Sequence, residues 1–219
     1  MIVIVDYDMG NLGSILNMLK KVGIAAAISR DPMVIAGAER LILPGVGAFD
    51  RGMAGLRDLG LLPVLDRKVR DEGCPILGLC LGMHLMTRGS EEGQLPGLGW
   101  MEADTRRFRF DASRRDLKVP HMGWNAVHSR GDSLLLQGFE GPPRFYFAHS
   151  YYVACDSADD VLGTTTFGFD FASVIGRGHV FGTQFHPEKS HRFGMRLLAN
   201  FARVEGVDRT AVPHGTAQC

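Results

Sequence analysis

The first eighty residues alternate short apolar runs with amphipathic segments, and this alternation constrains the fold more than any other feature of the chain. Ile2–Val5 is a continuous β-branched run, and Ile24–Ile28, Leu41–Leu43 and Pro75–Leu79 are further apolar runs of strand length. Uninterrupted apolar strands are typical of a parallel sheet that is covered on both faces. The alternation therefore predicts a doubly wound α/β sheet.

The segments between these runs have the spacing and the end residues of helices. Ser14 is expected to cap a helix that has apolar positions on one face and ends at Gly23. Two further helices are expected at Phe49–Leu59 and Leu61–Glu72. In sheets of this kind, reactive groups are expected at the carboxyl ends of the strands.

From about residue 95 the pattern changes to strand-like pieces separated by turns rich in Gly, Asp, Pro and Ser. This texture predicts antiparallel additions in the C-terminal half, at Leu98–Met101, Thr105–Phe110, Trp124–His128, Phe145–Phe147, Tyr151–Ala154, Leu162–Thr166, Ser173–Ile175 and Val180–Gln184. A helix near Arg192–Arg203 is expected to close the fold. Residues 1–205 are expected to form one domain, and residues 206–219, which lack periodicity, a flexible C-terminal tail.

Composition excludes several classes of function. Lys plus Arg and Asp plus Glu are balanced at 24 each, which gives no electrostatic indication of a nucleic acid or an anionic membrane. The four cysteines form no C-x-x-C pair, and no Cys/His cluster has zinc-ligand spacing, so no metal is expected. The start of the chain lacks a basic segment and no apolar run is long enough for a membrane span. A cytoplasmic protein with reduced thiols is expected.

Gly78-Leu79-Cys80-Leu81-Gly82 is the strongest local signal for chemistry. It is the cysteine version of the G-x-S-x-G turn, in which a strand ends, the nucleophile sits at the tip, and a helix follows. The positive end of that helix favours a thiolate at Cys80. The alternative interpretation is a buried cysteine between two incidental glycines.

A second signal follows the last predicted strand, where His186 and Glu188 flank Pro187. In extended backbone, side chains two positions apart leave the same side, so the carboxylate is expected beside the imidazole. Such a carboxylate orients the ring and supports its protonated form. His-Pro-Glu alone also fits an ordinary strand end, but together with Cys80 it completes a nucleophile, a base and an orienting group.

A third signal is the loop Pro44–Phe49, which follows the third predicted strand. Gly45, Val46 and Gly47 of this loop are expected to lie beside Cys80 and to turn a backbone N–H toward a developing oxyanion, together with the N–H of Leu81. Without the other two signals, a plain strand-to-helix turn would be the preferred interpretation.

Together with three longer stretches, these motifs resemble class I (triad) glutamine amidotransferases over residue 1 to about 203. The stretches are Asp6-Tyr-Asp-Met-Gly-Asn11, Val119-Pro-His-Met-Gly-Trp-Asn125 and Phe145-Tyr-Phe-Ala-His-Ser-Tyr-Tyr152. Within the family, the similarity is to glutaminase subunits of imidazole glycerol phosphate synthase. The resemblance implies hydrolysis of L-glutamine and delivery of ammonia to a HisF-like (β/α)8-barrel partner in a heterodimer of histidine biosynthesis.

The resemblance also implies roles for individual residues, and it implies no cofactor. Cys80, His186 and Glu188 would be catalytic, and Leu81 with Gly45, Val46 and Gly47 would form the oxyanion hole. Substrate-binding positions would be Gly82, His84, Ser150 and Tyr151. Positions facing the partner would be Asn11, Trp124, Tyr146 and Lys189.

His84 departs from the family pattern, which usually has Gln at this position to contact the substrate. An imidazole can replace one hydrogen bond of an amide but not its donor and acceptor together in the same geometry. Three alternatives therefore stay open beside the histidine pathway. They are a paralogue that supplies ammonia to a sugar-amidating synthase of surface polysaccharide biosynthesis, a free-standing cysteine hydrolase, and a catalytically inactive binding subunit.

Overall fold

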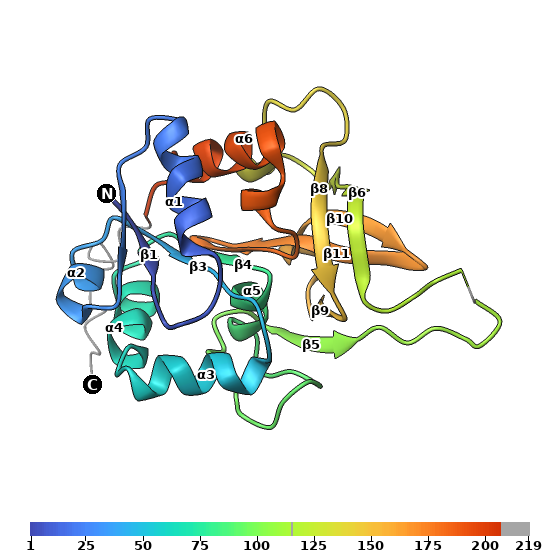
Figure 1. The fold of residues 1–219 in the computed structure, drawn as a ribbon, viewed down its shortest axis with the longest axis horizontal. Helices are drawn as coiled ribbons and strands as arrows, with labels where there is room; N and C mark the ends of the chain where they lie inside the picture. Colours follow the sequence, from blue (N-terminus) through green and yellow to red (C-terminus); the bar gives the residue numbers. More distant parts are fainter. Residues whose placement is uncertain (115, 207–219) are drawn as a thin grey trace, which may run out of the picture.

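The computed structural model describes residues 1–114 and 116–206, and a parallel sheet forms its centre (Figure 1). β1 (Ile2–Val5) lies between β2 (Ala26–Ser29) and β3 (Arg40–Leu43), β4 (Ile76–Leu79) pairs with β3, and β12 (Val180–Thr183) runs parallel to β4. The first four apolar runs therefore form strands close to the expected boundaries. Most of the expected tail, residues 207–219, lies outside the described residues.

Helices cover both faces of this sheet, as the uninterrupted apolar strands predict. Val3 and Val5 of β1 face one core, whereas Ile2 and Ile4 face the other, because successive side chains of a strand point to opposite sides. Figure 1 shows one face covered by α3 (Phe49–Asp58), α4 (Leu62–Asp66) and α5 (Leu81–Leu85), and the other by α1 (Leu12–Lys21) and α6 (His191–Phe201).

Two of the expected helices begin or end elsewhere. The N-cap of α1 is Asn11, whose side chain accepts a hydrogen bond from the Ser14 backbone N–H at 3.4 Å, so the expectation that Ser14 caps the helix was wrong. The single helix expected at Leu61–Glu72 is α4 followed by a π-helical segment, η1 (Arg67–Asp71). The sequence pattern is helical throughout this segment, but after Asp66 the backbone hydrogen bonds change from the α-helical spacing of four residues to the π-helical spacing of five.

The short helix α2 (Pro32–Ala36) has a sequence signal of its own. Asp31 is its N-cap and accepts a hydrogen bond from the Met33 N–H at 2.8 Å, and Pro32 occupies the first helical position. An acceptor side chain followed by proline is a strong helix start. The helix is only one turn long, so it leaves little apolar periodicity to detect.

The C-terminal half adds antiparallel strands, as expected, but the strand expected at Val180–Gln184 is β12, which runs parallel to β4 and is antiparallel only to β11. β11 (Phe169–Arg177) pairs with β12, β10 (Val161–Phe167) and β9 (Tyr151–Cys155). The remaining strands and 3-10 turns are β5 (Ala103–Arg107), β6 (His121–Ala126), β7 (His128–Ser129), β8 (Arg144–His149), η2 (Leu134–Leu136), η3 (Ala158–Asp160) and η4 (Pro187–Lys189). β5 pairs with β9 and β7 with β10, whereas β6 and β8 form a separate two-stranded sheet.

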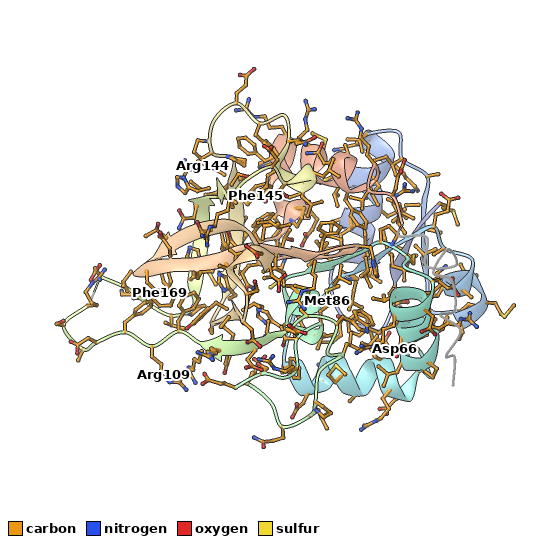
Figure 2. All side chains as sticks on the ribbon, turned by 180° about the vertical axis from the view of Figure 1, so that it is seen from behind. Asp66, Met86, Arg109, Arg144, Phe145 and Phe169 are labelled. Atoms are coloured by element: carbon orange, nitrogen blue, oxygen red, sulfur yellow. The ribbon has the colours of Figure 1, made fainter. Side chains whose placement is uncertain are left out.

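The expected strand Leu98–Met101 was wrong, because this segment is irregular. Its backbone N–H groups donate to residues that follow the Cys80 turn and not to a neighbouring strand. The Leu98 N–H donates to the Leu85 carbonyl at 2.8 Å, and the Trp100 N–H donates to the Met86 carbonyl at 2.9 Å. Met86 itself is fully buried and lies in the middle of the packed side chains in Figure 2.

Alternation also decides which side chains of β8 reach the core. Figure 2 labels the consecutive residues Arg144 and Phe145, of which Arg144 is exposed and Phe145 is completely buried. Phe145 stacks on Phe185, with ring centroids 3.8 Å apart. This contact ties the two-stranded sheet to the segment that leaves β12.

The pairing of β12 with β4 determines where Cys80 and the segment with His186 leave the sheet. Thr183 lies opposite Leu79, the last residue of β4. The Cys80 N–H donates to the Thr183 carbonyl at 2.8 Å. Cys80 and the segment Gln184–His186 therefore leave the sheet side by side, at the carboxyl edge of two neighbouring parallel strands.

Candidate active site

Cys80 lies at the tip of a sharp turn between β4 and α5, as the Gly-x-Cys-x-Gly pattern predicts. Its φ is 51° and its ψ is −106°, a left-handed conformation that costs a non-glycine residue roughly 1–3 kcal/mol. The residue is 6% exposed. The turn places Cys80 at the N-cap of α5, directly before the first helical residue.

The two flanking glycines are required by close backbone approach. A Cβ at Gly78 would lie 2.7 Å from the Met83 nitrogen, and a Cβ at Gly82 would lie 1.8 Å from the Leu43 carbonyl oxygen of β3. No rotamer change can relieve a contact with backbone. Gly82, an expected substrate-binding position, thus packs α5 against β3.

Gly82→Ala is expected to destabilise the fold by about 3 kcal/mol or more, because the added methyl forces α5 away from β3. The matched control is Gly89→Ala, since a Cβ at Gly89 meets nothing within 4 Å. Urea unfolding midpoints measure both effects. If Gly82→Ala and Gly89→Ala unfold at the same urea concentration, the close approach at Gly82 is wrong.

His186 and Glu188 are brought together by a turn rather than by extended backbone, which corrects the expectation. Residues Pro187–Lys189 form the 3-10 turn η4, and the His186 Nδ1 to Glu188 Oε1 distance is 2.9 Å. The two side chains are 3% and 4% exposed. Such a buried carboxylate holds the ring with Nδ1 protonated and Nε2 free to face the reaction.

Two neighbours make the imidazole of His186 basic. Burial alone lowers the pKa of His186, but hydrogen bonding to the Cys80 sulfur and to Glu188 outweighs burial and raises this pKa above the usual value of 6.5. A cysteine and a histidine arranged in this way favour a thiolate beside an imidazolium.

Ser190, which the motif analysis left without a role, fixes the His186 turn to β8. Its hydroxyl donates to the His186 carbonyl at 2.6 Å and accepts from the Tyr146 N–H at 3.0 Å. The His186 N–H in turn donates to the Tyr146 carbonyl at 2.9 Å. Three hydrogen bonds therefore set the position of the imidazole.

The loop after β3 lies against the Cys80 turn, as expected for strand ends at one edge. A Cβ at Gly45 would lie 2.8 Å from the Leu81 Cβ and 2.6 Å from the Tyr7 hydroxyl. Tyr7 is buried and donates to the Pro44 carbonyl. Burial, with the nearby Cys80 sulfur, raises the pKa of Tyr7, so this phenol stays neutral and braces the loop.

A cavity of about 300 Å³ opens over Cys80, within the size range of small-molecule sites. It is lined by Val46, Gly47, Cys80, Leu81, His84, Glu92, Pro120, Met122, Ala148, His149, Ser150 and Tyr151. Six residues that were expected to form the oxyanion hole or to bind the substrate thus line the same cavity as Cys80. Gly45 and Gly82 are not part of the lining.

Glu92 is the acidic residue of this cavity, and the motifs did not reveal it. Its Oε2 accepts a hydrogen bond from the Phe49 N–H at 3.0 Å. Partial desolvation of the carboxylate raises the pKa of Glu92, although the residue as a whole is exposed. The residue lies in a turn-rich segment without periodicity, so only the folded chain shows that it reaches the cavity.

Three of the four expected partner positions form one group. The Trp124 and Tyr146 rings are 6.2 Å apart, and the Lys189 Nζ lies 5.6 Å from the Tyr146 ring centroid. Trp124 is 40% exposed. Asn11, the fourth position, caps α1 and is exposed.

No group of three or more His, Cys, Asp or Glu side chains within residues 1–114 and 116–206 is arranged to hold a metal ion. In the same described part, no helix combines the length and the apolar character that a membrane crossing requires.

Comparison with known proteins agrees with this geometry. The glutamine amidotransferase class-I family model matches residues 3–204. A protein named imidazole glycerol phosphate synthase subunit HisH 2 from Methanococcus maripaludis is 49% identical over 203 residues, which are 93% of this chain and 99% of the relative. A protein of the same name from Pseudomonas aeruginosa is 49% identical over 204 residues, 93% of this chain and all of the relative.

Solved structures share the fold at lower identity. A crystal structure titled glutamine amidotransferase has a TM-score of 0.70 and 22% identity, and the match covers 91% of this chain and 96% of that one. A structure of PurLQS from Thermotoga maritima has a TM-score of 0.67 and 16% identity, covering 92% of this chain and 96% of the matched one. With the match over residues 3–204 and relatives at 49% identity, the chain belongs to the class I glutamine amidotransferases.

Proposed function

We propose that this chain is the glutaminase subunit of an imidazole glycerol phosphate synthase, which hydrolyses L-glutamine and passes ammonia to a HisF cyclase subunit in histidine biosynthesis. The observation that carries the proposal is the strained Cys80 turn beside His186, which is bonded to Glu188. The names of relatives at 40–49% identity support the choice of synthase. In this proposal residues 1–205 act as one domain, and the heterodimer works in the cytoplasm.

Cys80 is the nucleophile in the first half of the reaction. Its thiolate attacks the side-chain carbonyl carbon of glutamine and forms a tetrahedral intermediate. The imidazolium of His186 then gives its proton to the amide nitrogen, and ammonia leaves as the γ-glutamyl thioester forms. In the second half, neutral His186 takes a proton from water, which attacks the thioester and releases glutamate.

The negative oxygen of both intermediates is assigned to backbone donors. Leu81 is the first residue of α5, so its N–H has no carbonyl partner within the helix. The loop of Gly45, Val46 and Gly47 lies beside it and supplies the second donor. Removing one donor of such a pair typically costs about 10²- to 10³-fold in rate.

The amino-acid end of glutamine is assigned to other residues of the cavity lining. Ser150, Tyr151, His84 and Glu92 all line the cavity. A carboxylate complements the α-ammonium group of an amino acid, and Glu92 is the acidic residue of the cavity lining. Glu92 is therefore the proposed partner of the substrate ammonium.

Glu92→Gln is expected to raise KM for glutamine about 10-fold while kcat falls less than about threefold, since a charged hydrogen bond outside the reacting atoms is lost. The variant keeps an oxygen for the Phe49 N–H, so the fold should be retained. Steady-state glutamate release measures both constants. Glu91→Gln is the matched control, because Glu91 bonds outside the cavity to Arg107 and Arg109. An unchanged KM in Glu92→Gln would remove Glu92 from the substrate site.

The ammonia is proposed to leave through a closed passage to the partner, because ammonia that reaches water is mostly protonated and no longer a nucleophile. Trp124, Tyr146 and Lys189 lie beside the His186 turn and are proposed to contact the HisF barrel together with Asn11. The contact between Lys189 and Tyr146 couples η4, which carries Glu188, to this surface.

The experiment is glutamate release from glutamine by the purified chain, alone and with a HisF barrel saturated with its ribonucleotide substrate. Strong stimulation by the liganded barrel, with formation of imidazole glycerol phosphate, is the expected result. Full turnover without the barrel would contradict the proposal in favour of a free-standing hydrolase. Turnover only with a sugar-amidating synthase partner would contradict the histidine pathway but not the glutaminase chemistry.

A further inference from the structure

Gln184 is a completely buried residue at the end of β12 that contacts the nucleophile. Its Nε2 lies 3.9 Å from the Cys80 sulfur, and its Oε1 lies 2.8 Å from the Nε2 of His84. The Gln184 backbone is fixed by a hydrogen bond from its N–H to the Ser173 carbonyl at 2.9 Å. A chain of contacts thus runs from His84 through the Gln184 amide to Cys80.

The contact at 2.8 Å between the Gln184 Oε1 and the His84 Nε2 fixes which way this amide faces. His84 is 4% exposed, and burial lowers its pKa to about 4, so the ring is neutral near pH 7. A neutral imidazole has one N–H, and the Gln184 oxygen can only accept, so His84 must donate from Nε2. With its oxygen held in this way, the Gln184 amide has to turn its NH2 group toward Cys80.

We propose that Gln184 and His84 form a positioning pair, in which His84 orients the Gln184 amide and the amide donates an N–H to the Cys80 sulfur. The pair rests on the proposed function only in taking Cys80 as the nucleophile. An N–H donor favours the thiolate over the thiol, because a thiolate is the stronger acceptor. The donor therefore acts in addition to His186.

The pair also limits what the histidine at position 84 can offer to a bound molecule. Because Nε2–H is committed to Gln184, the remaining ring nitrogen, Nδ1, carries a lone pair and can serve the cavity only as an acceptor. A glutamine at position 84 could instead donate its own amide N–H to Gln184 and so keep the same orientation. The expected substrate role of His84 is then confined to Nδ1.

Substitution of Gln184 removes no hydrogen bond of the other described titratable groups around Cys80. The titratable groups that face this region are His186 from the η4 turn, Tyr7 from the segment after β1, and Glu92 and His149 in the cavity. None of these is hydrogen-bonded to Gln184 among the described residues. A change in thiol reactivity on substitution of Gln184 therefore reports on the amide.

The test is the pH dependence of Cys80 alkylation by iodoacetamide, followed by mass spectrometry of the Cys80 peptide without glutamine or partner. The alkylation midpoint is the pH at which the rate of Cys80 alkylation is half of its maximum. Gln184→Met keeps the side-chain length but removes the N–H donor, and it is expected to move this midpoint upward by roughly 0.5 to 1 pH unit. His84→Leu is expected to move it in the same direction by a smaller amount. The double variant should match Gln184→Met alone, because both changes act through one amide.

Two matched variants control for loss of packing. His84→Gln keeps a donor for Gln184 and is expected to leave the midpoint in place. Thr87→Val removes a buried hydroxyl that bonds to the His84 carbonyl at 2.8 Å but does not reach Cys80, and should also leave it in place.

Three results would overturn the pair. They are an unmoved midpoint in folded Gln184→Met, an equal shift in Thr87→Val, and additive shifts in the double variant. If Gln184→Met does not fold, an unmoved midpoint in His84→Leu has the same meaning. If Cys80 of the unsubstituted chain is not alkylated at any pH tested, both its role as nucleophile and the pair are contradicted. If Cys80 is reactive but Gln184→Met leaves the midpoint in place, only the pair is contradicted.

Discussion

Cys80→Ala is expected to reduce glutamate formation from glutamine by at least about 10⁴-fold, because the thioester cannot form without the thiolate. The same variant, mixed with the HisF barrel, should still support product formation from added ammonium salts. Glutamate release and product formation are measured on the same complex. The second measurement separates loss of chemistry from loss of the fold.

The matched control is Cys155→Ala, which should keep full glutaminase activity. Burial raises the pKa of the Cys155 thiol to about 12, and nearby Asp160 adds to the effect, so this thiol stays protonated and unreactive. Burial likewise raises the pKa of Cys74 to about 11. If Cys80→Ala retained more than about one hundredth of the activity, the nucleophile assignment would be wrong.

Glu188→Gln is expected to lower kcat by about 10²- to 10⁴-fold with little change in KM, because an amide neither balances the imidazolium nor fixes the ring as a carboxylate does. Since Glu188 raises the pKa of His186, its loss should also move the alkaline limb of the rate profile to lower pH. In the proposed mechanism His186 must be protonated to release ammonia, so activity is expected to fall as pH rises through this pKa.

A matched control for Glu188→Gln is Glu140→Gln, which makes the same change at an exposed turn. Its kcat and pH profile should equal those of the unsubstituted chain. If Glu188→Gln lowers kcat but leaves the alkaline limb in place, Glu188 is not the group that sets the protonation of His186.

Features that depend on local pattern could be predicted from the sequence. β1 and the Cys80 turn follow from uninterrupted apolar residues and from glycines that backbone contacts require at 78 and 82. Chemistry at the carboxyl ends of parallel strands follows from topology. The meeting of His186 with Cys80 could be inferred, although the extended geometry expected for residues 186–188 was wrong because the chain turns there.

Features that depend on contacts between distant segments could not be predicted. Glu92 and Gln184 reach the site only through the way their segments pack, and no periodicity or spacing marks either residue. The Leu98–Met101 segment has strand-like residues, but its N–H groups bond to Leu85 and Met86 instead. Asn11 and Ser14 are both good caps, and only the folded helix decides between them.

Asp8 has an unusual backbone conformation for a residue with a side chain. Its φ is 62°, a region in which glycine is favoured and aspartate is tolerated. Arg30 bonds to both Asp6 and Asp8, each at 2.7 Å, and offsets part of the conformational cost.

The central claim, that Cys80 is the nucleophile of a glutamine-specific site, is tested most directly by covalent labelling. The chain is incubated with an electrophilic glutamine analogue such as acivicin, with and without excess glutamine, and the modified residue is located by mass spectrometry. We expect a single adduct on Cys80 that glutamine suppresses, with loss of glutamate release in proportion to labelling. An adduct on another residue, or labelling of Cys80 that glutamine does not suppress, would contradict the account.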